Sequence, residues 1–264
     1  MFTLGARVLL NYSLKQDRTG DVRPTFAARR FSCGALPVFA MTLTFAAVDW
    51  LMTMTYTWFS TMWGVYIFAG SAMSSMALII VIVTAFKSLG YLKIVNEEHY
   101  HIKGKLMHAF VIFWAYITFS QYFLIWYANI TEETQFYLIR NTGGWSYVSM
   151  MLMVTHFIIP FVILLVRGVK KNTVKVGIVS GWLLGAHMLD MYWIVIPMRG
   201  PRLAAQGLID STNPIVAEHA WIGDIVAVVT MVSVLTYVFL RYVSRHSLYP
   251  CGDPRLEESM KLTN

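Results

Sequence analysis

Six apolar runs, separated by short segments that hold nearly all of the charge, constrain this chain more than any other feature. The clearest run extends from Ala109 to Ile130 and is interrupted by one isolated amide, Gln121. An apolar stretch of about 20 residues is long enough to cross a bilayer core. Trp126 and Tyr127 lie near its end, where aromatic rings suit the membrane–water interface. The run therefore predicts a transmembrane helix.

The other runs have the same character. We expect spans at about 35–56, 62–86, 106–130, 145–166, 176–198 and 215–240. Hydrophobic residues make up 57% of the chain, charged residues 13%, and the mean hydropathy is +0.56. These values are typical of membrane proteins and exclude an ordinary soluble domain. The sequence predicts an all-α polytopic membrane protein, and we interpret the net charge of +7 as loop charge, not as a nucleic-acid surface.

The distribution of Lys and Arg predicts the orientation. Eighteen of the 21 basic residues lie in segments 1–34, 87–105, 167–175 and 241–264. The segments on the other side hold only Arg140, Arg199 and Arg202. Cytoplasmic loops of membrane proteins carry an excess of Lys and Arg. We therefore expect a multi-pass membrane protein with both termini in the cytoplasm.

The terminal segments are expected to lie outside the six-span domain, which we place at 35–243. In segment 1–34 the apolar piece Met1–Leu10 is too short to span a membrane and carries Arg7. The piece fits either an interfacial helix or the stump of an upstream helix. Because segment 1–34 holds six Lys and Arg residues, we interpret it as a cytoplasmic basic segment. Segment 244–264 is expected to be a cytoplasmic tail that holds a partner.

The two cysteines, Cys33 and Cys251, both fall on the predicted cytoplasmic side, where thiols stay reduced. The chain has no CxxC or CxxCH motif and no cysteine cluster. Iron–sulfur clusters need several cysteine thiolates, and c-type haems need the CxxCH attachment motif. We therefore expect this chain to ligate no cofactor, and any such centres to sit on partner subunits.

Ionisable residues inside membrane spans are costly, so each one suggests a function. The candidates for a proton path are Asp49, His156, His187, Asp190, Glu218, His219 and Asp224. His187 and Asp190 are three residues apart and share a helix face, so the carboxylate can orient the imidazole. We expect His187, Asp190 and Asp49 to line one hydrated cavity, extended by His156 and by Glu218 or Asp224. Each could instead be a hydrogen-bonded core residue or lie at the wet interface.

Three further residues are candidates for contact with a quinone: Gln121, Trp126 and Tyr192. Gln121 also has a structural interpretation, because an amide inside a span often forms a hydrogen bond between helices. We expect that interhelical hydrogen bond.

Several segments resemble one family of membrane subunits. FSQYFLIWYANITEET, preceded by GKLMHAFVIFWAY, carries most of the similarity, which continues through TLTFAAVDWLM, FSTMWGVYIFAG, HFIIPFVILL and HMLDMYWIV. These segments resemble the NrfD-like (polysulfide-reductase type) integral membrane subunits of Alternative Complex III, a bacterial quinol:cytochrome c oxidoreductase. The second of that complex's two large NrfD-like subunits is the more similar. Relatives usually carry Asn-Ile-Pro where this chain has Asn129-Ile130-Thr131.

The resemblance implies a location in the bacterial cytoplasmic membrane, an architecture and partners. Family members usually have about ten spans containing two four-helix bundles, so this chain would be a C-terminal six-helix portion with one four-helix bundle. Its partners would be a sister NrfD-like subunit, an Fe–S subunit and c-type cytochrome subunits, besides lipids and quinol. The chain would be a non-catalytic or quinone-side subunit, serving as a scaffold with a proton-conducting or quinone-contacting role.

Two other functions fit the intramembrane residues. A b-haem protein would use His156 with His187 or His219 as axial ligands. An ion-coupled transporter would use the acidic residues as coupling sites and would show inverted repeats and broken spans. No convincing internal repeat is visible in the sequence, and the resemblance favours a subunit of a respiratory or photosynthetic quinol-oxidising complex.

Overall fold

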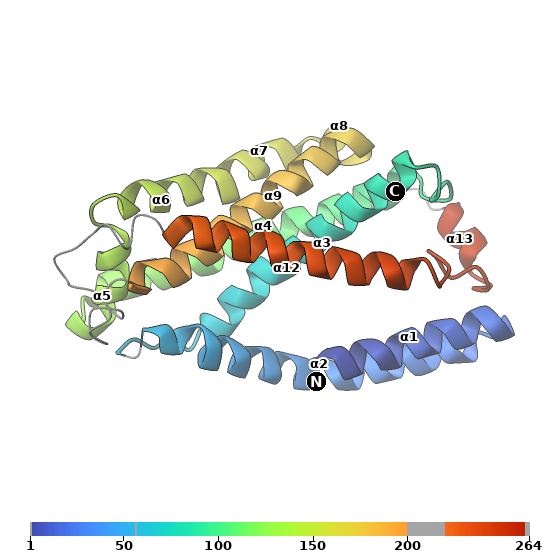
Figure 1. The fold of residues 1–264 in the computed structure, drawn as a ribbon, viewed down its shortest axis with the longest axis horizontal. Helices are drawn as coiled ribbons and strands as arrows, with labels where there is room; N and C mark the ends of the chain where they lie inside the picture. The colour runs from blue at the N-terminus through green and yellow to red at the C-terminus, as the bar shows by residue number, and fades with distance from the viewer. Residues whose placement is uncertain (1, 56, 200–219, 262–264) are drawn as a thin grey trace. The chain divides into compact units, whose positions relative to one another are not determined.

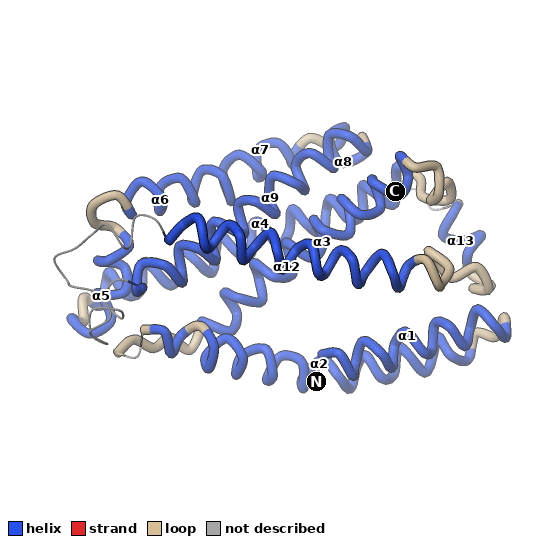
Figure 2. Tube along the Cα trace, in the orientation of Figure 1, coloured by secondary structure: helices blue, strands red, loops and turns tan. Residues whose placement is uncertain are grey.

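The computed structural model describes residues 2–55, 57–199 and 220–261. Within these ranges the regular structure is helical throughout, without a strand (Figure 2). Six helices are long and apolar enough to cross a membrane. The prediction of an all-α polytopic membrane protein is therefore confirmed.

The long helices follow the predicted spans closely. The elements are α1 (Phe2–Thr19), α2 (Arg23–Trp50), η1 (Met52–Met54), α3 (Trp63–Ser88), α4 (Glu97–Ala128), α5 (Thr131–Arg140), α6 (Trp145–Leu152), η2 (Met153–Ile158), α7 (Ile159–Leu165), α8 (Arg167–Lys171), α9 (Thr173–Val195), η3 (Ile196–Met198), α12 (Ala220–Val243) and α13 (Leu256–Met260). Some helices extend past the apolar runs. Their outer turns lie beyond the hydrocarbon core, where polar residues are also stable in a helix.

The first span shows the largest difference in boundary. Its apolar run was expected from residue 35, whereas α2 begins at Arg23. The carboxylate of Asp21 accepts a hydrogen bond from the Arg23 N–H at 3.1 Å, which satisfies one of the free N–H groups at the helix start. Pro24 follows in the first turn, where a missing N–H costs nothing. The apolar piece near the N-terminus is also helical, within α1.

Four of the candidate spans form a bundle. Helix α3 packs against α4 and α9, and the rod formed by α6, η2 and α7 packs against α4 and α9 (Figure 1). The fourth span is one continuous rod in which Met153–Ile158 is π-helical. Short π segments inside α-helices alter which side chains face inward and are frequent at functional sites. This segment contains His156.

Helix α4 has well-defined ends. The Asn96 side chain accepts from the His99 N–H, and the His99 ring accepts from the Asn96 N–H, which together form a capping box. At the other end Asn129 has φ +50°, the left-handed conformation that commonly terminates a helix. The capping box explains why α4 starts at Glu97, well before the apolar run that it contains.

The bundle interior consists of two apolar clusters. The first is rich in aromatic rings and includes Trp63, Tyr66, Trp114, Phe136 and Trp193. The second is mainly aliphatic and includes Met73, Ile80, Met107, Val111, Leu164 and Leu183. Along α3, α4 and α9 the members of one cluster are separated in sequence from those of the other, so each cluster fills a different length of the bundle.

The chain divides into two compact units: 1–5, 31–197 and 257–264 in one, 6–30 and 198–256 in the other. The bundle belongs to the first unit. In the second unit Asp17 accepts hydrogen bonds from the Ser247 hydroxyl at 3.1 Å and from the Gly252 N–H at 3.0 Å. These bonds hold the segment after α12 to α1.

The predicted orientation can be tested with Cys251, whose side chain is exposed. In a Cys33→Ser background, a membrane-impermeant maleimide added to intact cells should leave Cys251 unlabelled, because the basic loops predict a cytoplasmic C-terminus. Permeabilised cells should label it. A cysteine introduced at the exposed Asn141, between α5 and α6, is the matched control and should be labelled in intact cells. The reverse pattern would contradict the orientation.

Candidate functional site

The central residue of the candidate site is Asp190, a carboxylate on α9 that is 1% exposed. The Tyr66 hydroxyl on α3 donates a hydrogen bond to Oδ1 of Asp190. The Trp114 indole N–H on α4 donates to Oδ2 at 3.2 Å. Three helices of the bundle thus meet at one carboxylate, and two donors orient it.

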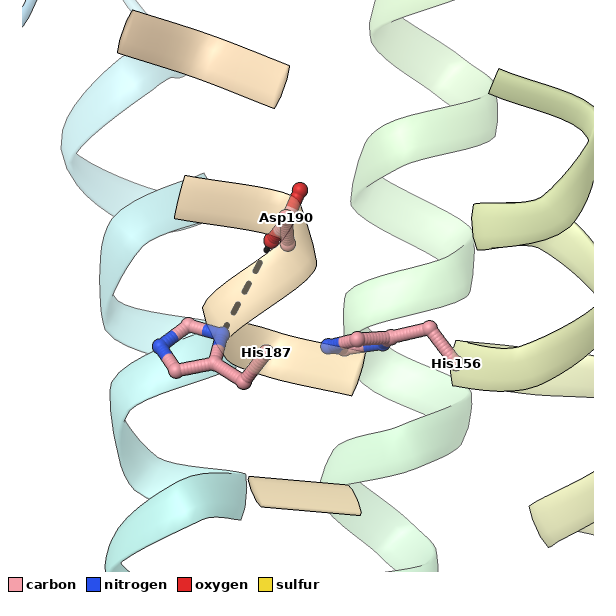
Figure 3. Close-up of side chains that lie close together, drawn as sticks. All are labelled: His156, His187 and Asp190. Atoms are coloured by element: carbon pink, nitrogen blue, oxygen red, sulfur yellow. Dashed lines mark ion pairs between the residues drawn. The ribbon is translucent and has the colours of Figure 1, made fainter. Parts of the chain in front are cut away.

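His187 lies one turn earlier on α9. Its Nδ1 is 3.8 Å from Oδ2 of Asp190 (Figure 3), which is too long for a hydrogen bond but close enough for an ion pair when the imidazole is protonated. Gly70 on α3 provides the space for the ring, since a Cβ at that position would lie 2.6 Å from Cε1 of His187. The absence of a side chain at Gly70 therefore determines how closely α3 approaches this imidazole.

His156 completes the group from the π segment of the fourth span. Its side chain is fully buried, and neither ring nitrogen has a hydrogen-bond partner among the described residues. Its ring lies against the Trp114 ring, with centroids 3.8 Å apart, and 5.9 Å from the His187 ring. Figure 3 shows His156 reaching toward His187 from the neighbouring helix. A buried imidazole without a partner is unusual and needs an explanation.

We call Tyr66, Trp114, His156, His187 and Asp190 the Asp190 cluster. It lies where the two apolar clusters meet: on α4, Trp114 follows Val111, which belongs to the aliphatic cluster. On α9 the two polar residues fall between Leu183 of the aliphatic cluster and Trp193 of the aromatic one. The polar groups are therefore enclosed by apolar packing along the bundle on both sides.

This arrangement can hold and transfer a proton. A carboxylate, two imidazoles and a phenol each accept or release protons, and they are close enough for transfer directly or through one water. Surrounding apolar packing lowers the local dielectric and strengthens each interaction. His187 and Asp190 lie side by side, as the i, i+3 spacing predicted, but without a hydrogen bond between them, and His156 lies beside both, as expected.

The remaining proton-path candidates do not join this cluster. Asp49 is exposed on α2, contrary to our expectation that it would line the same cavity. The reason is helix geometry: the buried face of α2 carries Ala47, and residues two apart point about 200° away from each other. Asp224, on α12 in the second unit, pairs with Arg199 through two contacts of 2.8 and 2.5 Å. Glu218 and His219 lie outside the described residues.

The candidates for quinone contact differ in exposure. Gln121 on α4 is buried, and neither atom of its amide has a hydrogen-bond partner among the described residues. The interhelical hydrogen bond expected for Gln121 is therefore not formed among the described residues. Trp126 is 63% exposed, as expected for a ring at the interface. Tyr192 is half-buried, and its ring lies 6.0 Å from that of Trp145.

Sequence reasoning missed Arg140, which lies outside the candidate spans and yet is fully buried. Its guanidinium donates to the carbonyls of Trp193 at 3.1 Å, Ile194 at 2.7 Å and Phe136 at 2.9 Å. Burial lowers the pKa of Arg140 to about 10, so the group stays cationic at neutral pH. One feature of the sequence could have pointed to Arg140. It is one of only three basic residues in the loops on the predicted non-cytoplasmic side.

Tyr66 and Trp114 were also missed. Aromatic residues are abundant in this chain, so neither stands out by type. A tyrosine or tryptophan in the middle of a span must place its polar atom against a partner. That rule gives a reason to look at both residues, but it does not identify Asp190 as their shared acceptor.

In comparisons with known proteins, no family model matches this chain and no curated protein matches it significantly.

Proposed function

We propose that this chain is an integral membrane subunit of a quinol-oxidising electron-transfer complex of the Alternative Complex III type, and that the Asp190 cluster exchanges protons within it. The observation that carries the proposal is a fully enclosed carboxylate beside two imidazoles in the middle of an apolar bundle. Such groups are retained in membrane spans chiefly where they serve a function. The sequence resemblance supports the type of complex.

The chemistry of a quinol fits a subunit that handles protons while partner subunits carry the electrons. Oxidation of a quinol releases two electrons and two protons, and the two must leave by different routes. The carboxylate and imidazoles of the Asp190 cluster suit the protons. The two cysteines are exposed and belong to no cluster motif, so the electrons would pass through Fe–S and c-haem centres of partner subunits.

The surface of α12 is compatible with such an assembly. Large apolar side chains along this helix, including Ile225, Val229 and Leu235, are more than half exposed in the isolated chain. In a membrane these side chains would face lipid or the apolar helices of a neighbouring subunit, such as the sister NrfD-like subunit.

A b-haem held by His156 and His187 fits the packing less well. The Trp114 ring already lies 3.8 Å from the His156 ring, and the Asp190 carboxylate lies beside both imidazoles. A macrocycle between the two histidines would have to displace this packing. A Soret band in the purified chain would favour the haem after all.

Purification under mild conditions tests the proposal. The chain, carrying a C-terminal affinity tag and solubilised from native membranes, should co-purify with a sister membrane subunit, an Fe–S subunit and c-type cytochromes. Mass spectrometry would identify them, and a reduced-minus-oxidised difference spectrum would detect the c-haems. The same tag on an unrelated multi-pass protein is the control. A stable chain that oxidises quinol with no partner, or that co-purifies with no redox subunit, would contradict the proposal.

A further inference from the structure

We propose that His156, His187 and Asp190 form a binding site for one divalent transition-metal ion of the zinc class. Each of the three residues offers a ligand atom, and these atoms all lie within 4.8 Å of one another. The site goes beyond the proposed function and does not depend on it. A bound metal ion and a transferred proton would compete for the same imidazole nitrogens, so the site cannot hold both at once.

The unpartnered nitrogens of His156 are the independent observation that indicates a ligand. The ring is 0% exposed, and both nitrogens lack a partner in the described part of the chain. A polar group left buried without a hydrogen bond destabilises the folded chain. Nδ1 of His187 is also without a hydrogen bond. A metal ion placed between the two rings would satisfy one nitrogen of each.

The donor set selects the class of metal. Two imidazoles and one carboxylate suit Zn²⁺ and similar ions, whereas Mg²⁺ and Ca²⁺ prefer oxygen ligands. Zn–N bonds of about 2.0–2.1 Å place tetrahedral ligand atoms about 3.3 Å apart. The three atoms must therefore draw together by up to about 1.5 Å when the metal binds, through rotation of the two imidazole side chains.

The surroundings support the carboxylate ligand. Tyr66 and Trp114 each donate to a different oxygen of Asp190 and fix its orientation, and both oxygens keep a lone pair. Such outer partners commonly orient metal ligands. With one carboxylate and two neutral imidazoles around a divalent ion, the site would have a net charge of +1. A water molecule would complete four-fold coordination, as in open zinc sites.

Cobalt titration tests the site, because Co²⁺ replaces Zn²⁺ and the cobalt X-ray absorption edge is separate from the iron edge of the partner subunits. The full chain, purified with its partners and stripped by a chelator, should bind one Co²⁺ in a four-ligand shell, and Zn²⁺ should displace it. His156→Gln should weaken binding at least tenfold. Tyr66→Phe, which keeps all three ligands, should weaken it about tenfold. His246→Gln, at an exposed histidine after α12, should leave binding unchanged.

A readout on the unaltered protein covers the case in which the variants fail to fold. X-ray absorption of the zinc-loaded wild type should show two imidazole nitrogens in a four-ligand shell. A shell of oxygen ligands only, or no cobalt bound by the wild type, would overturn the site. Equal cobalt binding by wild type and a folded His156→Gln variant would overturn it too. If the chain binds cobalt but co-purifies with no redox subunit, only the proposed function is contradicted. If it co-purifies with redox subunits but binds no cobalt, only the metal site is contradicted.

Discussion

Replacing Arg140 with methionine should lower the free energy of unfolding of the bundle by about 3–5 kcal/mol, because the change strands several buried carbonyls at once. Two of the three acceptors, Trp193 and Ile194, lie at the end of α9, where the last carbonyls of a helix have no partner within it. The guanidinium also lies 3.6 Å from the Phe136 ring centroid, a cation–π contact that methionine cannot replace.

The measurement is thermal or denaturant unfolding in detergent, followed by tryptophan fluorescence. A thiol-reactive dye is unsuitable, because both cysteines are already exposed in the folded chain. Arg140→Lys keeps the charge but loses the planar fork and should lose an intermediate amount of stability. Arg23→Met, at a side chain that is 92% exposed, is the matched control and should change stability by less than about 0.5 kcal/mol. A loss below about 1 kcal/mol for Arg140→Met would show that water satisfies these carbonyls.

Under the proposed function, replacing Asp190 with asparagine should lower quinol-dependent cytochrome c reduction by the assembled complex at least tenfold. Proton transfer by a positioned side chain typically contributes about 10²–10⁴ in rate, and asparagine cannot carry the proton. The amide has nearly the same volume and can still accept one of the two hydrogen bonds from Tyr66 and Trp114. Assembly, measured by subunit content and haem absorbance, should therefore be retained.

Two further variants separate proton transfer from structure. Asp190→Glu restores a titratable carboxyl and should recover part of the turnover, which a purely structural role would not predict. Asp21→Asn removes the same charge from a half-exposed side chain between α1 and α2 and should leave turnover unchanged. Full turnover with unchanged proton release in an assembled Asp190→Asn complex would reduce the Asp190 cluster to a structural role.

The sequence alone determined the fold class and the approximate spans. Runs of about 20 apolar residues between charged segments have few stable alternatives, because a backbone in hydrocarbon must satisfy its hydrogen bonds within the helix. The i, i+3 spacing likewise determined that His187 and Asp190 would be neighbours, since both are on one helix. Local geometry is sufficient for each of these inferences.

The tertiary structure decided which distant residues meet. Tyr66, Trp114 and His156 reach Asp190 only through the packing of α3, α4 and the fourth span against α9, which depends on Gly70 and on the π segment around His156. The same packing leaves Asp49 exposed, although it is as ionisable as Asp190 and also lies inside a span. Arg140 is a basic residue outside the spans, yet it is buried because α5 folds back onto the end of α9. Helical periodicity sets the face of each residue, but only the rotation and approach of whole helices determine which faces come into contact.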